Sequence, residues 1–167
     1  VGDYVVATFC TPCETYIPDP YVLGFNKIKK WCMDNGVTFH GKIEESPGEI
    51  AAIEDTKERD RRRRKWIINR KPEIVHDALE EHGKPVFFLD CDDELLDKPT
   101  FPECDVGYLR NPERMLASTS RTHLLISSTA VIAPTEDGIR FVKAWKEYTK
   151  IVNDHRAIQM AWTNCIK

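Results

Sequence analysis

The residues most able to do chemistry lie in a short acidic segment in the middle of the chain. Four carboxylates fall within five residues, at Asp90, Asp92, Asp93 and Glu94. Carboxylates this close repel one another, and a bound divalent cation removes that repulsion. The pair Asp90 and Asp92, in an Asp-x-Asp spacing, can therefore hold Mn²⁺ or Mg²⁺ against the oxygens of a diphosphate. The alternative is a solvated acidic turn, and Asp93, Glu94 or both are candidates to cap the turn that follows.

The run Val86–Leu89 comes directly before these acids and is entirely apolar. A short apolar run between Lys84-Pro85 and an acidic segment predicts a strand that is buried on both faces. In open α/β sheets, ligands bind at the carboxyl ends of such strands. The sequence therefore places the acidic segment where an α/β protein binds its ligand.

The remaining patterns supply the elements around this strand. The chain opens with strand, loop, helix and strand, the unit that builds a parallel sheet. Further strands are expected at Tyr4–Phe9, Val37–Ile43, Asp105–Leu109 and within Thr122–Ala133. Helices are expected at Tyr21–Asn35, through Trp66–Asn69, from Pro72 to His82, at Pro134–Ile151 and at Asp154–Trp162, where Asp154 is a candidate cap.

Composition indicates one globular α/β domain over residues 1–167, without repeats or a low-complexity linker. The hydrophobic and charged fractions are 41% and 31%, and the net charge of −3 argues against a general polyanion-binding protein. No apolar run approaches the roughly 18 residues of a membrane span, and no signal peptide is visible. We expect a cytoplasmic protein whose six cysteines are reduced.

The motif order resembles the nucleotide-diphospho-sugar transferases of the GT-A fold, and the resemblance covers nearly the whole chain. Its specific part is the D-x-D motif in FFLDCDDEL. The strand YVVATF, the segment Trp66–Pro72, the Ser128-Thr129 strand and Asn153-Asp154-His155 accompany it in the same order. The resemblance implies a three-layer α/β/α sandwich with a mostly parallel sheet.

The resemblance also implies a metal-dependent glycosyltransferase that moves a sugar from a nucleoside-diphosphate sugar to a glycan, protein or nucleic-acid acceptor. Asp92 would be the main ligand of Mn²⁺ or Mg²⁺, and Asp90 would lie toward the ribose and the metal. The metal would neutralise the departing nucleoside diphosphate, whose charge grows as the sugar–phosphate bond breaks.

Other positions acquire roles through the same resemblance. Asp154 would lie near the sugar, as a base or as a partner of a sugar hydroxyl. Lys71 matches a basic or polar position near the donor. The remaining residues would surround the donor, with Thr8 and Phe9 at the base and ribose, and Ser128 and Thr129 at the sugar or the acceptor.

Similar enzymes often take a further metal ligand, frequently a histidine, from a segment after the last helix. This sequence stops at Lys167, soon after that helix. Either the segment is missing, or another group or water completes the coordination. His123 and His155 are candidates, but a structural role is the stronger expectation for each.

Two further motifs have ordinary interpretations. The Cys10-x-x-Cys13 spacing follows a strand, as in thioredoxin-like sites, but Pro18 and Pro20 argue against the helix that such a site needs. A second cysteine pair that would complete a zinc site is absent from the sequence. The basic run Arg61–Lys65 is either a solvated helix face or a contact to a diphosphate or polyanion, and its residues circle a helix too widely for all five to reach one ligand.

Two alternatives remain open at this stage. A phosphohydrolase of the haloacid-dehalogenase type also places D-x-D after an apolar strand, with the first aspartate as nucleophile. The motif lies mid-chain here, and a later acidic pair for its metal site is not found in the sequence. The second alternative is a non-catalytic module that binds a nucleotide sugar, or nucleic acid through Arg61–Lys65.

Overall fold

The computed structural model describes residues 3–13, 17–100, 103–110 and 125–165. The strands are β1 (Val5–Cys10), β2 (Thr38–Ile43), β3 (Val86–Leu89), β4 (Val106–Arg110) and β5 (Leu125–Ile132). The helices are α1 (Pro20–Asn35), α2 (Gly48–Ala51), α3 (Thr56–His82), α5 (Glu136–Ile151) and α6 (Asp154–Cys165). In the described part of the chain, no helix is both long enough and apolar enough to span a membrane.

The five strands form one mixed sheet in the order β2-β1-β3-β5-β4. Strand β1 pairs in parallel with β2 and β3, whereas β5 runs antiparallel to both β3 and β4. Strands β1, β2, β3 and β4 thus run in one direction, and β5 is the exception to the expected mostly parallel sheet, because residue patterns alone do not give the direction of a strand. The carboxyl ends of β1, β2 and β3 still share one edge of the sheet, as the sequence predicts.

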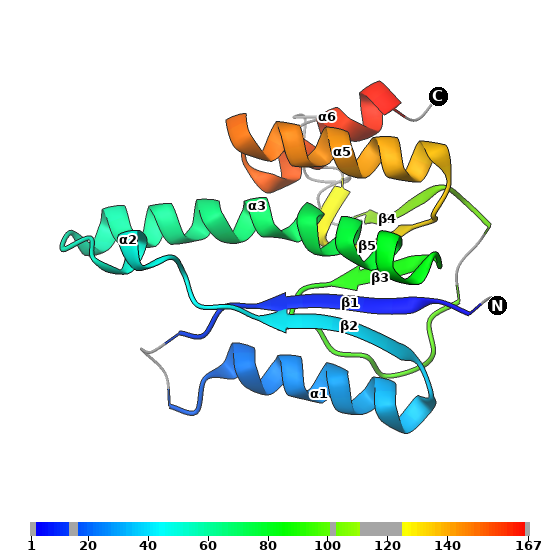
Figure 1. Cartoon of the computed structure of the whole chain (residues 1–167), viewed down its shortest axis with the longest axis horizontal. Helices are drawn as coiled ribbons and strands as arrows, with labels where there is room; N and C mark the ends of the chain where they lie inside the picture. Colours follow the sequence, from blue (N-terminus) through cyan, green and yellow to red (C-terminus); the bar gives the residue numbers. More distant parts are fainter. Residues whose placement is uncertain (1–2, 14–16, 101–102, 111–124, 166–167) are drawn as a thin grey trace.

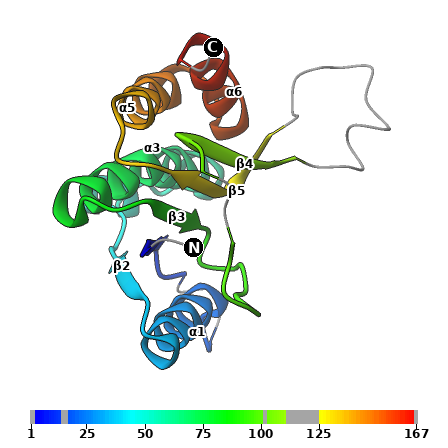
Figure 2. The ribbon, with the colours of Figure 1, turned by 90° about the vertical axis from the view of Figure 1, so that its right-hand side faces the viewer.

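Helices cover both faces of the sheet, which gives three layers (Figures 1 and 2). Alternate residues of β1 face opposite sides, because side chains of a strand alternate. Val5 and Ala7 belong to the core beneath α3, α5 and α6. Val6 belongs to a second core beneath α1, which contributes Ile28. All four residues of β3 are buried, so this strand is covered on both faces, in agreement with its apolar sequence.

Helix α3 is one continuous helix of 27 residues, whereas the sequence suggested a break at Pro72. A proline inside a helix removes one N–H donor and crowds the carbonyl four residues earlier. Here Pro72 is itself buried, as are Val75 and Leu79 on the same side of the helix. Burial of this apolar face offsets the local cost, and the helix continues until Gly83 (φ 59°) ends it.

The length of α3 affects the edge of the sheet at which the sequence predicts a ligand. Its N-terminal half extends beyond the carboxyl ends of β1 and β2 (Figure 1). Two separate helices would not have placed a rigid wall there. The overhanging half of α3 therefore faces the loops that follow β1 and β3.

Candidate functional site

A cavity of about 600 Å³ lies between the overhanging half of α3 and the loops that follow β1 and β3. This volume is within the usual range for small-molecule sites. Its walls bring together Phe9 from β1, Asp90 and Asp92 after β3, and Arg63, Arg64 and Lys71 from α3. Acidic and basic side chains thus meet around one cavity at the edge where the sequence predicts a ligand.

Behind one wall of the cavity, Lys71 lies between two carboxylates. Its Nζ is 2.8 Å from Asp90 and 3.1 Å from Asp154. The Lys71 and Asp154 side chains are only 12% and 7% exposed. Trp145 Nε1 donates a hydrogen bond of 3.2 Å to the other Asp154 oxygen. These contacts run from Asp90 through Lys71 and Asp154 to Trp145, and they connect the cavity to the core beneath α3, α5 and α6.

Burial and charge act in opposite directions on this group. Burial raises the pKa of Asp90 to about 6, although the ammonium of Lys71 opposes that shift. For Lys71, burial alone would lower the pKa, but the carboxylates of Asp154 and Asp90 outweigh it and raise the pKa above its ordinary value. Lys71 is therefore a permanently charged part of the cavity wall at neutral pH.

The neighbouring acids play different structural parts. Asp93 accepts hydrogen bonds from the Asp90 backbone N–H at 3.3 Å and from the Thr129 hydroxyl at 3.4 Å. It closes the turn after β3, as one of the sequence interpretations proposed. Burial and the charge of Asp92 raise the pKa of Asp93. Asp92 is exposed and lines the cavity, so it is the carboxylate of this turn most accessible to a ligand.

The basic run at the start of α3 divides into different faces, as its helical spacing predicts. Arg61 and Arg62 point to the exposed face and bind Glu58, at 2.6 and 2.8 Å. Lys65 points away from the cavity and donates to the backbone carbonyl of Val152 at 2.9 Å. These three residues are thus engaged elsewhere.

Arg63 and Arg64 are the members of the run that reach the cavity. Arg63 donates to the backbone carbonyls of Thr11 and Pro12, at 3.1 and 2.6 Å, and so fixes the loop after β1. Arg64 is exposed and has no ion-pair or hydrogen-bond partner among the described residues. Its guanidinium is available to an anionic ligand.

Some of the predicted site residues lie elsewhere. Thr8 is fully buried and is not part of the cavity wall, because the alternation of β1 turns it away from Phe9. Asp154 does not cap α6, because Asn153 accepts the hydrogen bond from the Arg156 backbone N–H at 3.0 Å. Thr129 contacts Asp93 rather than the cavity.

Three other positions lie outside what the structure describes. Residue His123 belongs to a range that is not described, and the side chains of Ser128 and His155 are likewise not described. The expected roles of these residues therefore remain predictions.

The Cys10-x-x-Cys13 pair is divided between two environments. Cys10 is buried in a cluster with Phe25 and Cys91, whereas Cys13 lines the cavity. Helix α1 begins only at Pro20, so the helix of a thioredoxin-like site does not follow Cys13. All six cysteines are free thiols.

The sequence contained a signal for the α3 wall that the expected break at Pro72 concealed. Residues Asp60, Arg64, Ile67 and Lys71 are spaced by three or four positions and lie on one face of a continuous helix. With the helix divided before Pro72, Lys71 fell outside that pattern. The link between Trp145 and Asp154 had no sequence signal, because it joins two helices across their packing interface.

The donor set of the cavity accommodates a divalent ion at Asp92 better than at Asp90. Both oxygens of Asp90 lie 2.8 Å from Lys71 Nζ, whose charge opposes a cation there. Asp92 carries an accessible carboxylate, and phosphate oxygens and water can complete the shell of a hard ion. Within the described residues, the group of three metal-ligating side chains lies instead at His40, Glu81 and His82.

No family model matches the chain, and no curated protein matches it. One solved structure that matches is described as the crystal structure of a glycosyltransferase involved in the glycosylation of the major capsid of PBCV-1. The match has a TM-score of 0.49 and 12% sequence identity, and it covers 90% of this chain and 68% of that chain. A similarity at this level does not assign a fold family or an activity.

Proposed function

We propose that the protein is a metal-dependent glycosyltransferase that takes a sugar from a nucleoside-diphosphate sugar. The observation that supports this most directly is the composition of the cavity. Asp92 offers a carboxylate to a divalent ion, and Arg64 supplies positive charge from α3. A diphosphate is the kind of ligand that uses both, because its oxygens bind a hard metal and accept hydrogen bonds from guanidinium groups.

Each wall of the cavity would have its own task. Asp92 would hold Mn²⁺ or Mg²⁺, which supplies electrostatic stabilisation of the leaving diphosphate when bound. Arg64 would bind phosphate oxygens, and Arg63 would keep the loop after β1 in place. Phe9 and Ile67 add apolar surface suited to a nucleobase.

Asp90 and Asp154 would support the reaction through Lys71. Asp154 is buried and does not line the cavity, so in this proposal it would be a positioning residue and not the base or the partner of a sugar hydroxyl that the resemblance implies. The two carboxylates hold the Lys71 ammonium at the cavity wall.

Calorimetric titration of the chain with a panel of nucleoside diphosphates, with and without Mn²⁺, tests the proposal. We expect Asp92→Asn to weaken Mn²⁺-dependent binding at least tenfold, because a charged ligand is lost. Asp97→Asn is the matched control, since Asp97 is exposed in the same segment and does not line the cavity.

A second pair of variants tests the basic wall. Arg64→Ala should weaken nucleoside diphosphate binding about tenfold or more, the usual cost of a hydrogen bond to a charged group. Arg61→Ala should change it less than about twofold, because Arg61 binds Glu58 on the exposed face. The proposal would be overturned if nucleoside diphosphate binding were the same with and without Mn²⁺ and were unchanged by both Asp92→Asn and Arg64→Ala. Phosphate release from simple phosphoesters would favour a phosphohydrolase, and salt-sensitive DNA binding a nucleic-acid module.

A further inference from the structure

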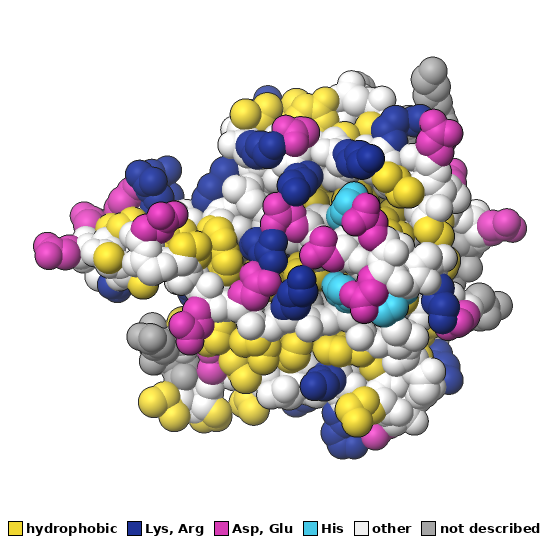
Figure 3. All heavy atoms as spheres, in the orientation of Figure 1, with side chains coloured by type: hydrophobic (Ala, Val, Ile, Leu, Met, Phe, Trp, Pro, Cys, Tyr) yellow, Lys and Arg dark blue, Asp and Glu magenta, His cyan; other side chains and the backbone are white. Residues whose placement is uncertain are grey.

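The face between β2 and α3 carries a row of paired charges, and at one end of this row histidine takes the place of lysine or arginine. Acidic, basic and histidine side chains alternate along this face (Figure 3). Every second residue from His40 in β2 to Glu44 just after it is paired with one face of α3: Glu44 with Arg70 at 2.7 Å, Lys42 with Asp77 at 3.3 Å, and His40 with Glu81 at 3.4 Å. The first two are ordinary ion pairs, whereas the third includes a buried imidazole and a second histidine.

His40 is fixed by the sheet. It pairs in register with Ala7, whose side chain belongs to the core beneath α3, so His40 faces the same helix. Its side chain is only 7% exposed. Its Nδ1 lies 3.4 Å from Glu81 Oε2, and its buried Nε2 has no hydrogen-bond partner among the described residues.

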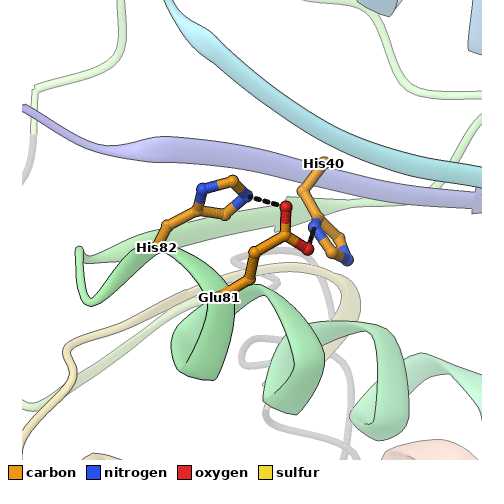
Figure 4. Close-up of side chains that lie close together, drawn as sticks. All are labelled: His40, Glu81 and His82. Atoms are coloured by element: carbon orange, nitrogen blue, oxygen red, sulfur yellow. Dashed lines mark ion pairs between the residues drawn. The ribbon is translucent and has the colours of Figure 1, made fainter.

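His82 approaches the same carboxylate from the last turn of α3. Its Nε2 lies 3.6 Å from Glu81 Oε1, beyond hydrogen-bond distance, and this buried nitrogen also has no hydrogen-bond partner in the described chain. The carboxylate of Glu81 lies between the two imidazole rings (Figure 4), whose centroids are 5.4 Å apart. Two ring nitrogens and one carboxylate oxygen converge here, all within 4.8 Å of one another.

These separations are close to those around a tetrahedral metal. Ligands about 2.0–2.1 Å from zinc at tetrahedral angles are about 3.3 Å from one another. The two ring nitrogens lie 3.4 and 3.6 Å from different oxygens of the Glu81 carboxylate, so a rotation of this exposed side chain is needed to bring one oxygen and both nitrogens around an ion. These separations are too long for good hydrogen bonds, so the carboxylate does not satisfy the two nitrogens by itself.

We propose that His40, Glu81 and His82 bind a divalent transition metal of the zinc class. Two imidazoles and one carboxylate form a ligand set that zinc uses, and Mg²⁺ and Ca²⁺ prefer all-oxygen ligands. Glu81 is 64% exposed, so water can occupy the fourth position. The ion would join β2 to the end of α3.

The protonation state of His40 is compatible with this role. Burial lowers the pKa of His40, and the nearby charges of His82 and Lys42 act in the same direction, while Glu81 and Asp77 oppose them. The imidazole is therefore neutral at neutral pH and has a free lone pair for a metal.

The site is separate from the cavity and independent of the proposed function. Glu81 follows Lys71 by ten residues along α3, which is about 15 Å along the helix axis. A zinc ion bound there would not contact Asp92.

The test is calorimetric titration of the full chain, free of any affinity tag and of metal, with Zn²⁺. We expect one ion per chain, a rise in melting temperature with Zn²⁺ and no comparable rise with Mg²⁺ or Ca²⁺. Glu81→Gln and His82→Gln should each weaken zinc binding at least tenfold. Both side chains lie at the end of a helix, and circular dichroism checks that the variants fold.

The same helix offers a matched control. His76 and Glu80 form a comparable pair at 3.6 Å, without a third ligand in the described part of the chain, so His76→Gln should leave zinc binding unchanged. Co²⁺ in place of Zn²⁺ should give the visible spectrum of a tetrahedral nitrogen–oxygen site without a thiolate charge-transfer band. Absence of binding, equal binding by all the variants, or a thiolate band from the free cysteines would each overturn the proposal.

Discussion

Lys71 Nζ lies 2.8 Å from the carboxylate of Asp90, and this ion pair links helix α3 to the turn after the central strand. It gives the two aspartates of the D-x-D motif different positions. Asp90 points back to α3, while Asp92 is exposed at the cavity. The motif is therefore divided between one residue that anchors the turn and one that is available to a ligand.

The first prediction concerns the stability of this anchor. Lys71→Met removes the charge that compensates Asp90 and Asp154, which lie on either side of it. Removing one partner of a buried ion pair typically costs about 3–5 kcal/mol of unfolding free energy. Urea unfolding of the variant should show a loss of that size.

Lys30→Met is the control for this experiment. The Lys30–Asp34 pair is closer, at 2.6 Å, but its side chains are 75% and 57% exposed. Its removal should change the unfolding free energy by less than about 0.5 kcal/mol. Equal losses in the two variants would mean that Lys71 is not a buried partner of these carboxylates.

The second prediction is a pH dependence of stability. Burial raises the pKa of Asp90 to about 6 from an ordinary value of 3.8, with Lys71 opposing. The folded chain then binds this proton more tightly than the unfolded chain, so Asp90 contributes its stability in full below about pH 3.8. That contribution is lost as the pH rises through about 6.

Asp90→Asn removes this titration. The unfolding free energy of the variant minus that of the wild type should therefore rise between about pH 4 and pH 6, by about 3 kcal/mol. Urea unfolding of both proteins at several pH values measures the difference, in which the titrations of distant groups cancel. A flat or falling difference would show that burial does not disfavour the charged form of Asp90.

The sequence predicted the position of the candidate site in the fold better than the contacts among its residues. The all-apolar run Val86–Leu89 followed by acids is enough to place a buried strand and a charged turn at its carboxyl end, because both depend on local pattern. The caps at Asn35-Gly36 and His82-Gly83 are local as well, and both helices end there. These features need no knowledge of distant contacts.

The errors came from features that depend on tertiary packing. The cost of Pro72 is local, but burial of the same helix face against the sheet decides that α3 continues. The direction of β5 is not encoded in its own residues. Aspartate is a common helix cap, yet Lys71, far away in sequence, and Trp145, on the preceding helix, draw Asp154 into the interior. Only the fold brings such partners together.

The last prediction concerns the contact between α1 and the D-x-D turn. Gly24 of α1 packs against the backbone of Cys91, which stands between the two aspartates. A Cβ at this position would overlap the Cys91 carbonyl oxygen and lie 3.1 Å from the carbonyl carbon. Backbone atoms cannot move aside as a flexible side chain can, so Gly24→Ala must displace the helix or the turn. The expected cost is about 1–3 kcal/mol of unfolding free energy, although alanine is the better helix former.

Gly48→Ala separates the effect of contact from that of helix propensity. Gly48 begins the short helix α2, and a Cβ there meets nothing within 4 Å. The unfolding free energy of Gly48→Ala should stay the same as that of the wild type or rise by up to about 1 kcal/mol. Because the turn carries Asp92, Gly24→Ala should also weaken Mn²⁺-dependent nucleoside diphosphate binding, and Gly48→Ala should not. If the two alanine variants match in urea unfolding and in calorimetry, α1 does not set the position of the turn.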